Sequence, residues 1–313
     1  MLSAQQSLAA LSEITARLGR ARHLDQVLTV ALDSLAELFG FEHSIVMLLD
    51  ETGASMFTIA SRGYEPAGIG SEVRVGDGVL GRAIAEVRPV RIGNLQRLLA
   101  YARTASEHSD TDMEIPLPGL PDANSQLAAP AVVRGHALGV VAIECADFGA
   151  FTAEDESLLA VIAHLVAAAV ELDRETTTSE TPDERLENRA PTDQRTSGSR
   201  PVADGIELRF YSIDGSTFLD GDYLIKGVPG RILWRLANEH TTSGRTEFTN
   251  RELRLDPTLD LPTLRDNLES RLILLKRRLD ERNAPLRIER TGRGTFRLHV
   301  TTTLRLESIN RAE

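Results

Sequence analysis

The stretch LRDNLESRLILLKRRLDERNAPLRIERTGRGTFRLHV, residues 264–300, decides the second half of the fold. Its leucines recur in steps of four, four, three and four, so they share one face of a helix: Leu264, Leu268, Leu272, Leu275 and Leu279. Two short segments follow, Leu286–Arg290 and Thr295–Val300, and the turn Thr291–Gly294 between them predicts a hairpin. We therefore expect an amphipathic helix, with its leucine face in a core, that runs directly into a β-hairpin.

The polar residues of this helix lie outside the leucine stripe, and most of them are basic. Between residues 261 and 300 the chain carries ten Lys and Arg against five Asp and Glu. A basic outer helix surface beside a basic hairpin tip is typical of a module that enters a groove of double-stranded DNA, although a basic face can also be merely solvated. We expect base or groove-edge contacts from Arg265, Asn267 and Arg271, with Ser270 beside them, and phosphate or minor-groove contacts from Arg277, Arg278 and Arg293.

The rest of the chain is acidic. The 313 residues together carry a net charge of −11 and have a pI of about 5.2, whereas residues 206–310 carry a net charge of +3. Phosphate binding requires local positive potential and not a positive total, so this balance does not exclude DNA. The acidic remainder is instead expected to reduce non-specific binding to nucleic acid.

The composition divides the chain into two domains and a linker. Residues 176–205 contain almost no apolar side chain, which predicts a flexible linker between a domain at 1–175 and a domain at 206–310. The single cysteine, Cys145, excludes an internal disulfide or a Cys-rich zinc cluster and fits a reducing cytoplasm. We find no apolar run long enough to span a membrane and no signal-peptide pattern, so we expect a cytoplasmic protein.

The first domain is predicted to mix helices with antiparallel strand pairs. Its helices are expected at Met1–Leu18, Leu24–Phe39 and from Thr152 to Leu172, and its strands at Ser44–Leu49, Ser55–Ser61, Ser125–Val133 and Leu138–Glu144. Thr152 is the predicted N-cap of the third helix, and Asp155 is placed to return the hydrogen bond. This pattern indicates an α+β domain.

Several ordered features of this domain resemble the GAF family of sensor domains. They are the turn Gly76–Gly81 that opens a helix, the segment Pro89–Ile92, the run Gly139–Val141 and the pattern Phe-x-x-x-Asp-x-x-x-Leu that begins at Phe151. The resemblance covers residues 4–173. It implies an antiparallel sheet with helices on both faces and a pocket for a small-molecule ligand beneath a variable lid. That lid corresponds to residues 94–124, a segment too long for an ordinary connection.

The resemblance places the ligand between the sheet and the helix at residues 78–87, with Gly78, Val79, Ala83 and His108 as the expected contacts. The sulfoxide reductases of the family need several cysteines, which excludes that chemistry here. A cyclic nucleotide and a haem with His108 as axial ligand remain alternatives. The cyclic-nucleotide motif matches only in its second half, and His108 lies among polar residues. The identity of the ligand therefore stays open, and no metal site is predicted.

The second domain is predicted to begin with short strands and to continue with three helices. The strands are expected at Ile206–Ser212, Ser216–Leu219 and Tyr223–Lys226, and the helices from Pro229, from Thr249 and just after Pro262. Three helices followed by a hairpin make a winged helix. Residues 206–300 resemble the winged-helix output domain of bacterial response regulators, which implies that the domain binds DNA.

Two apolar residues do not fit the DNA-facing surface. Ile273 and Leu274 lie outside the leucine stripe, and an exposed apolar pair more often marks a contact with protein. The first hypothesis is therefore a ligand-responsive transcription regulator, and the alternative is a signalling adaptor whose second domain binds a protein partner. We find no catalytic triad, phosphate loop or metal-ligand spacing, so we expect no enzymatic activity and name no catalytic residue.

The first and last helices of the first domain are rich in Ala and Leu on more than one side. A helix of this kind needs a second apolar surface, which predicts a homodimer through a helical bundle. A flexible linker cannot transmit a rotation, so we expect ligand control to act through dimer stability or through direct contact between the domains.

Overall fold

The computed structural model describes residues 4–97, 115–178, 205–261, 268–292 and 294–310, and the fold is given for these residues. The N-terminal domain is built on one antiparallel sheet with the strand order β3-β2-β1-β6-β5-β4. Its strands are β1 (His43–Leu49), β2 (Ser55–Arg62), β3 (Glu72–Arg74), β4 (Val90–Ile92), β5 (Ser125–Val133) and β6 (His136–Cys145).

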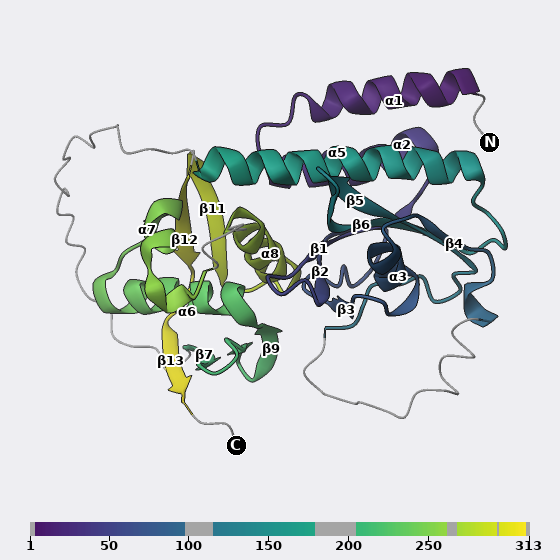
Figure 1. Ribbon diagram of the computed structural model, residues 1–313. Helices are drawn as coiled ribbons and strands as arrows, with labels where there is room; N and C mark the ends of the chain where they lie inside the picture. Colours follow the sequence, from purple (N-terminus) through teal and green to yellow (C-terminus); the bar gives the residue numbers. More distant parts are fainter. Residues whose placement is uncertain (1–3, 98–114, 179–204, 262–267, 293, 311–313) are drawn as a thin grey trace.

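Helices cover both faces of this sheet (Figure 1), as predicted for an α+β domain. The helices are α1 (Ala4–Leu18), α2 (Leu24–Phe39), α3 (Gly78–Glu86) and α5 (Ala153–Thr178). Alternate residues of β1 serve the two faces, because successive side chains of a strand point to opposite sides. Val46 and Leu48 join the hydrophobic cluster that includes α2 and α5, whereas Ile45 and Met47 pack with α3.

The cap of α5 follows the predicted geometry. The backbone N–H of Thr152 donates to Asp155 Oδ2 at 2.8 Å, and the N–H of Asp155 donates to Thr152 Oγ1 at 3.2 Å. The end of the helix differs from the prediction, because α5 continues past Leu172 to Thr178 and so includes the first residues assigned to the linker. Residues 179–204 lie outside the described part of the chain.

The C-terminal domain is a mixed α/β unit with two small sheets. The first sheet has the order β13-β7-β8-β9 and the second the order β10-β12-β11. The strands are β7 (Ile206–Tyr211), β8 (Thr217–Leu219), β9 (Asp222–Ile225), β10 (Glu247–Thr249), β11 (Leu286–Gly292), β12 (Thr295–Val300) and β13 (Leu304–Ile309). Strand β13 was not predicted, and it pairs in parallel with β7.

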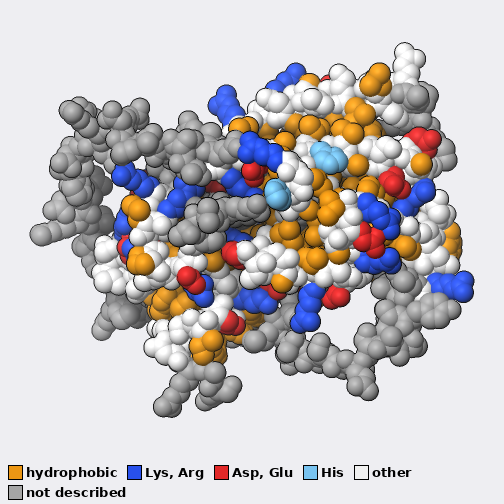
Figure 2. Space-filling view, viewed as in Figure 1, with side chains coloured by type: hydrophobic (Ala, Val, Ile, Leu, Met, Phe, Trp, Pro, Cys, Tyr) orange, Lys and Arg blue, Asp and Glu red, His pale blue; other side chains and the backbone are white. Residues whose placement is uncertain are grey.

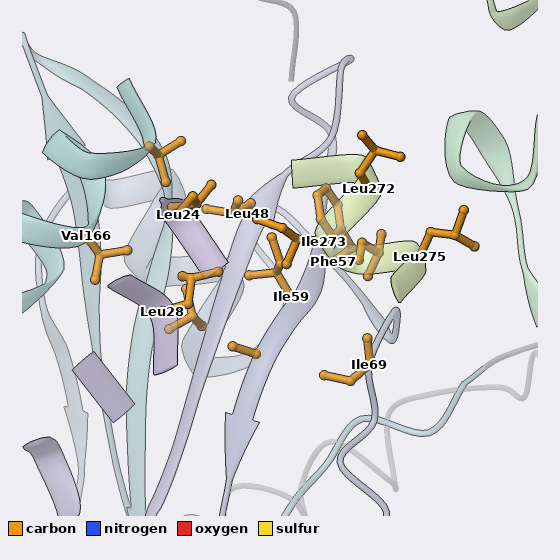
Figure 3. Packing of buried hydrophobic residues seen from close by; sticks show 14 of the residues in the cluster. Leu24, Leu28, Leu48, Phe57, Ile59, Ile69, Val166, Leu272, Ile273 and Leu275 are labelled. Atoms are coloured by element: carbon orange, nitrogen blue, oxygen red, sulfur yellow. The ribbon is translucent and has the colours of Figure 1, made fainter. Parts of the chain in front are cut away.

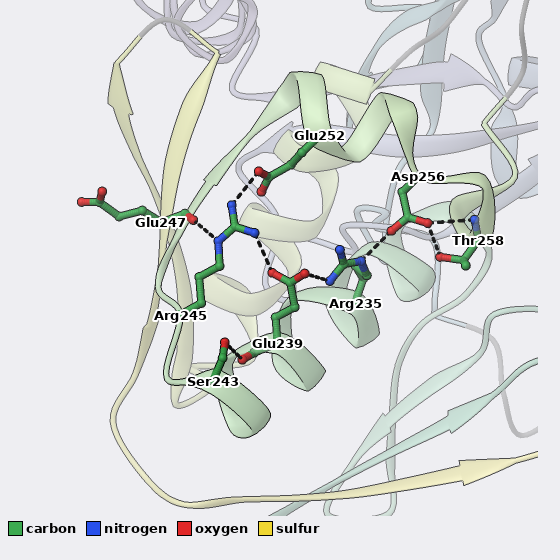
Figure 4. Close-up of polar contacts among 8 residues, drawn as sticks. All are labelled: Arg235, Glu239, Ser243, Arg245, Glu247, Glu252, Asp256 and Thr258. Carbon is green, nitrogen blue, oxygen red and sulfur yellow. Dashed lines mark hydrogen bonds and ion pairs between the residues drawn. The ribbon is translucent and has the colours of Figure 1, made fainter. Parts of the chain in front are cut away.

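Helix α6 (Gly227–Ser243) connects the first sheet to β10 of the second. Between β10 and β11 the described residues form α7 (Asn250–Leu255), the 3₁₀ turn η1 (Pro257–Leu259) and α8 (Leu268–Glu281). A chain of alternating charges joins α6 to α7 and to the turn after it (Figure 4). Glu239 contacts both Arg235 and Arg245, and these arginines also reach Asp256 and Glu252. Among the described residues, no helix combines the length and the apolar character that a membrane span requires.

Candidate functional site at the junction of the two domains

Helix α8, the predicted DNA-recognition helix, lies against the N-terminal domain. It contacts strand β2 and helix α2, and a single hydrophobic cluster contains residues of both domains. Ile273 and Leu274, the apolar pair outside the leucine stripe, are 4% and 3% exposed. Figure 3 shows Ile273 beside Phe57 and Ile59 of β2. The apolar pair of α8 therefore makes a protein contact, and its partner is a domain of the same chain.

Asp25, in the first turn of α2, accepts hydrogen bonds from two basic residues of α8. Lys276 Nζ lies 2.8 Å from Asp25 Oδ2, and Arg277 Nε lies 2.8 Å from Oδ1. Arg277 also donates to Thr29 Oγ1 at 3.0 Å and to the Ile59 carbonyl oxygen at 3.4 Å. Burial opposes the charge of Asp25, but Arg277 and Lys276 outweigh it and hold the pKa of the carboxyl below its usual 3.8.

Arg271 enters the junction at the other end of α8. Its guanidinium lies 4.6 Å from the centre of the Phe57 ring, and Nη2 is 2.6 Å from Glu51 Oε1 in the turn between β1 and β2. Only 5% of the side chain is exposed. A guanidinium prefers this combination of a carboxylate and an aromatic face.

Two further polar contacts join the domains. Glu281, at the end of α8, accepts a hydrogen bond from the Gly68 N–H at 2.7 Å. It also forms an ion pair with Arg278 at 2.7 Å. Lys226 forms an ion pair with Glu72 of β3 at 3.0 Å. Figure 2 shows acidic and basic side chains next to each other on this face of the molecule. At the junction itself, Glu51 and Asp25 pair with the basic residues of α8.

A cavity of about 400 Å³ lies between the domains, next to these contacts. Its lining includes Phe57, Glu72, Tyr223, Lys226 and Arg271. Both domains contribute charged and apolar walls, and the volume is that of a small-molecule site. Among the described residues, no group of three potential metal ligands is assembled.

Asp173, near the C-terminal end of α5, is a further carboxyl at this junction. Burial and the nearby charge of Glu269 on α8 raise its pKa to about 6, although Arg290 and Arg254 act in the opposite direction. The carboxyl therefore loses its proton at a higher pH than an exposed aspartate does.

The structure buries three of the residues of α8 that were predicted to contact DNA. Ser270, Arg271 and Arg278 are 2%, 4% and 7% exposed, because the helix is covered on more than its leucine face. Arg271 is covered by the N-terminal domain, and Arg278 donates to the Leu224 carbonyl oxygen within its own domain. Arg277 is also held at the junction. The predicted contacts Arg265, Asn267 and Arg293 lie outside the described residues.

The structure places two of the predicted ligand residues on the buried side of α3 and a third at its exposed start. Val79 and Ala83 are buried where α3 packs on the sheet, against a cluster that includes Met47 and Met56. Gly78 is exposed at the start of α3 with a φ of 59°. His108 lies outside the described residues.

Sequence reasoning missed the residues of the N-terminal domain that face α8. Asp25 and Glu51 look like ordinary surface acids in the sequence, because one begins a helix and the other lies in a turn. The signal that could have found the contact was the pair Ile273 and Leu274, which required an apolar partner surface.

Comparison with known proteins assigns the N-terminal domain. Residues 21–171 match the model of the GAF domain family. The GAF domain of a phosphoenolpyruvate-protein phosphotransferase from Coxiella burnetii is 21% identical, with 56% of this chain and 99% of that chain covered and a TM-score of 0.46. The GAF domain of the Acinetobacter phosphoenolpyruvate-protein phosphotransferase is 20% identical, with 58% of this chain and 100% of that chain covered and a TM-score of 0.46. The free methionine-R-sulfoxide reductase of Neisseria meningitidis is 18% identical, with 56% of this chain and 96% of that chain covered and a TM-score of 0.45.

No curated protein matches the chain, and residues 206–309 are not assigned to a family by these comparisons. The family match begins at residue 21 and so does not include helix α1. It contains the complete six-stranded sheet and most of α5. Residues 21–171 of this chain are a GAF domain.

Proposed function

We propose that this chain is a ligand-responsive transcription regulator, in which the GAF domain senses a small molecule and the C-terminal domain is a winged helix that binds double-stranded DNA. One observation carries the DNA-binding part. The basic helix α8 leads directly into the hairpin β11–β12, after helices α6 and α7 and a sheet of short strands. This is the element order of the response-regulator output domains that the sequence resembles, with α8 as the recognition helix and the hairpin as the wing.

The proposed DNA contacts are those predicted from the sequence. Arg265, Asn267 and Arg271 would contact base or groove edges, with Ser270 beside them, and Arg277, Arg278 and Arg293 would hold phosphates or the minor groove. Arg271 and Arg277 can reach DNA only after α8 has left the GAF domain. Arg278 would also have to give up its bonds to Leu224 and Glu281.

The GAF domain is proposed to bind a small molecule without catalysing a reaction. The predicted contacts Gly78, Val79, Ala83 and His108 stay a prediction, and haem and a cyclic nucleotide stay alternatives. The cavity between the domains is a second place to look for the ligand, because both domains line it. Mass spectrometry and an absorption spectrum of the purified protein would report a retained metabolite, a flavin or a haem.

A homodimer in the cytoplasm also stays a proposal, supported by the exposed Leu8 of α1 and Val161 of α5.

A signalling adaptor is the second candidate function, and the contacts of α8 favour it. The face of α8 that includes Ile273 and Leu274 already binds a protein surface, that of the GAF domain. In this alternative a partner protein would replace the GAF domain on α8, and DNA would not bind.

A titration of the full chain with mixed-sequence duplex DNA at two salt concentrations separates the two functions. If α8 and the wing hold phosphates, the affinity for DNA falls roughly a hundredfold or more between 50 and 200 mM salt. The reason is that binding releases cations from the DNA, and this release is less favourable at higher salt. Arg293→Ala should reduce this salt slope. The matched control Arg305→Ala removes the same charge from β13, in the other sheet, and should leave the slope unchanged. Absence of binding at both salt concentrations would favour the adaptor, provided that α8 is shown to leave the GAF domain.

A further inference from the structure

We infer that the GAF domain and duplex DNA compete for the same face of α8, and that the docked arrangement is the state in which the chain does not bind DNA. The docking surface of the GAF domain consists of Asp25, Glu51, Phe57, Ile59 and Gly68, which contact residues of α8. The inference rests on the proposed DNA-binding function and names how that function is controlled.

The polar half of the docking surface presents to α8 groups that resemble those of a nucleic acid. The Asp25 carboxylate accepts from Lys276 and Arg277 at 2.8 Å, as a phosphate would. Glu51 and the ring of Phe57 hold the Arg271 guanidinium between a carboxylate and a flat aromatic face. Two of the residues assigned to DNA by the sequence, Arg271 and Arg277, are therefore occupied by the GAF domain, and their donors cannot serve both partners.

The apolar half of the surface explains a feature of α8 that DNA binding does not require. Ile273 and Leu274 are almost completely buried in the docked state, and Figure 3 shows Ile273 beside Phe57 and Ile59. They would be largely exposed to water on a free winged helix, where apolar residues have no stabilising partner. A helix that alternates between a groove of DNA and a protein surface needs both the basic residues and this apolar pair.

The competition has a quantitative consequence. If only a small fraction of the chains is undocked, the apparent affinity for DNA falls by that fraction. A change that weakens docking raises the apparent affinity without any new contact to DNA. Because Asp25 and Glu51 lie on the GAF domain, their substitution changes docking and leaves every proposed DNA contact in place.

The test compares two double variants of the full chain. Asp25→Ala with Glu51→Ala removes two carboxylates that face α8. Asp33→Ala with Glu37→Ala removes two acids of α2 that pair with Arg62 and Arg17, inside the N-terminal domain and away from α8. Both variants lose the same charge, so any general electrostatic effect on DNA affinity is equal in the two. The measurements are the affinity for a mixed-sequence duplex and the hydrogen exchange of the α8 amides, with the amides of α5 as a report on the GAF fold.

We expect the first variant to bind duplex DNA about tenfold more tightly than the wild type and to exchange faster in α8, whereas the control variant behaves like the wild type. Unchanged exchange in α8 would overturn the inference, because Asp25 and Glu51 would then not hold the helix. Faster exchange with an unchanged affinity for DNA would also overturn it and would leave the DNA-binding function intact. Faster exchange without DNA binding in any variant would instead refute the proposed function.

Discussion

Replacement of Asp173 by Asn tests the electrostatics of the junction, because the expected effect depends on pH with a defined sign. Burial and the charge of Glu269 raise the pKa of Asp173 from 3.8 to about 6. The folded chain therefore binds this proton more tightly than the unfolded chain does. Protonated Asp173 therefore stabilises the folded chain relative to its ionised form. This contribution to the free energy of unfolding is fully present below pH 3.8 and is lost as the pH rises through about 6.

The magnitude follows from the same two values. At a pH above both, ionisation of Asp173 costs the folded state about 3 kcal/mol, and at pH 4.5 the cost is about 1 kcal/mol. Asn has nearly the shape of the protonated acid and does not ionise, so Asp173→Asn should raise the free energy of unfolding by about these amounts.

Urea unfolding of the full chain, followed by circular dichroism at pH 8 and at pH 4.5, measures the difference. Asp147, which is exposed after β6, provides the control. We expect Asp147→Asn to change the free energy of unfolding by the same small amount at both pH values. An effect of Asp173→Asn that is equal at the two pH values, or a loss of stability at pH 8, would refute the reasoning, since it would show that burial does not disfavour the charge at this position.

Three further substitutions test packing and polar contacts within the domains. A Cβ at Gly139 would lie 2.0 Å from the carbonyl oxygen of Met47, so Gly139→Ala should lower the free energy of urea unfolding by about 2 kcal/mol or more; a neutral effect would mean that β1 and β6 can separate at no cost. Thr152→Ala removes both bonds that the Thr152 hydroxyl makes at the start of α5 and should cost about 1 kcal/mol, measured as a lower Tm, and an unchanged Tm would contradict the cap. Glu239→Gln breaks the charged link between two arginines and should cost about 1 kcal/mol at low salt and less at high salt; a loss that does not depend on salt would point to packing instead.

Features of the fold that depend on neighbouring residues could be predicted from the sequence. The turns Asp214–Gly215 and Asp220–Gly221 separate β7, β8 and β9 as expected, and Thr152 caps α5, because a turn or a cap needs only a few consecutive side chains. The leucines of α8 are buried for the same reason, since helical spacing alone puts them on one face.

Features that depend on distant parts of the chain could not be predicted in this way. Strand β13 pairs in parallel with β7, almost a hundred residues earlier, and no local pattern specifies that partner. The surroundings of Arg271 and Arg277 come from α2 and from the turn after β1, so the local sequence of α8 predicts a solvent-facing surface that the structure does not show. A basic side chain carries no local sign of whether a carboxylate, a phosphate or water will meet it.

The position of the three main docking contacts indicates how a signal could pass between the domains without the linker. Asp25 begins α2, Glu51 lies in the turn between β1 and β2, and Gly68 lies between β2 and β3. These segments belong to different elements of the GAF domain, and α8 must meet all three at once. A shift of one element relative to the others would break some contacts while it kept the rest, and packed interfaces respond to such a shift by changing between discrete arrangements. A ligand that binds the GAF domain therefore needs to move only α2 or the edge of the sheet at β2 and β3 to release α8.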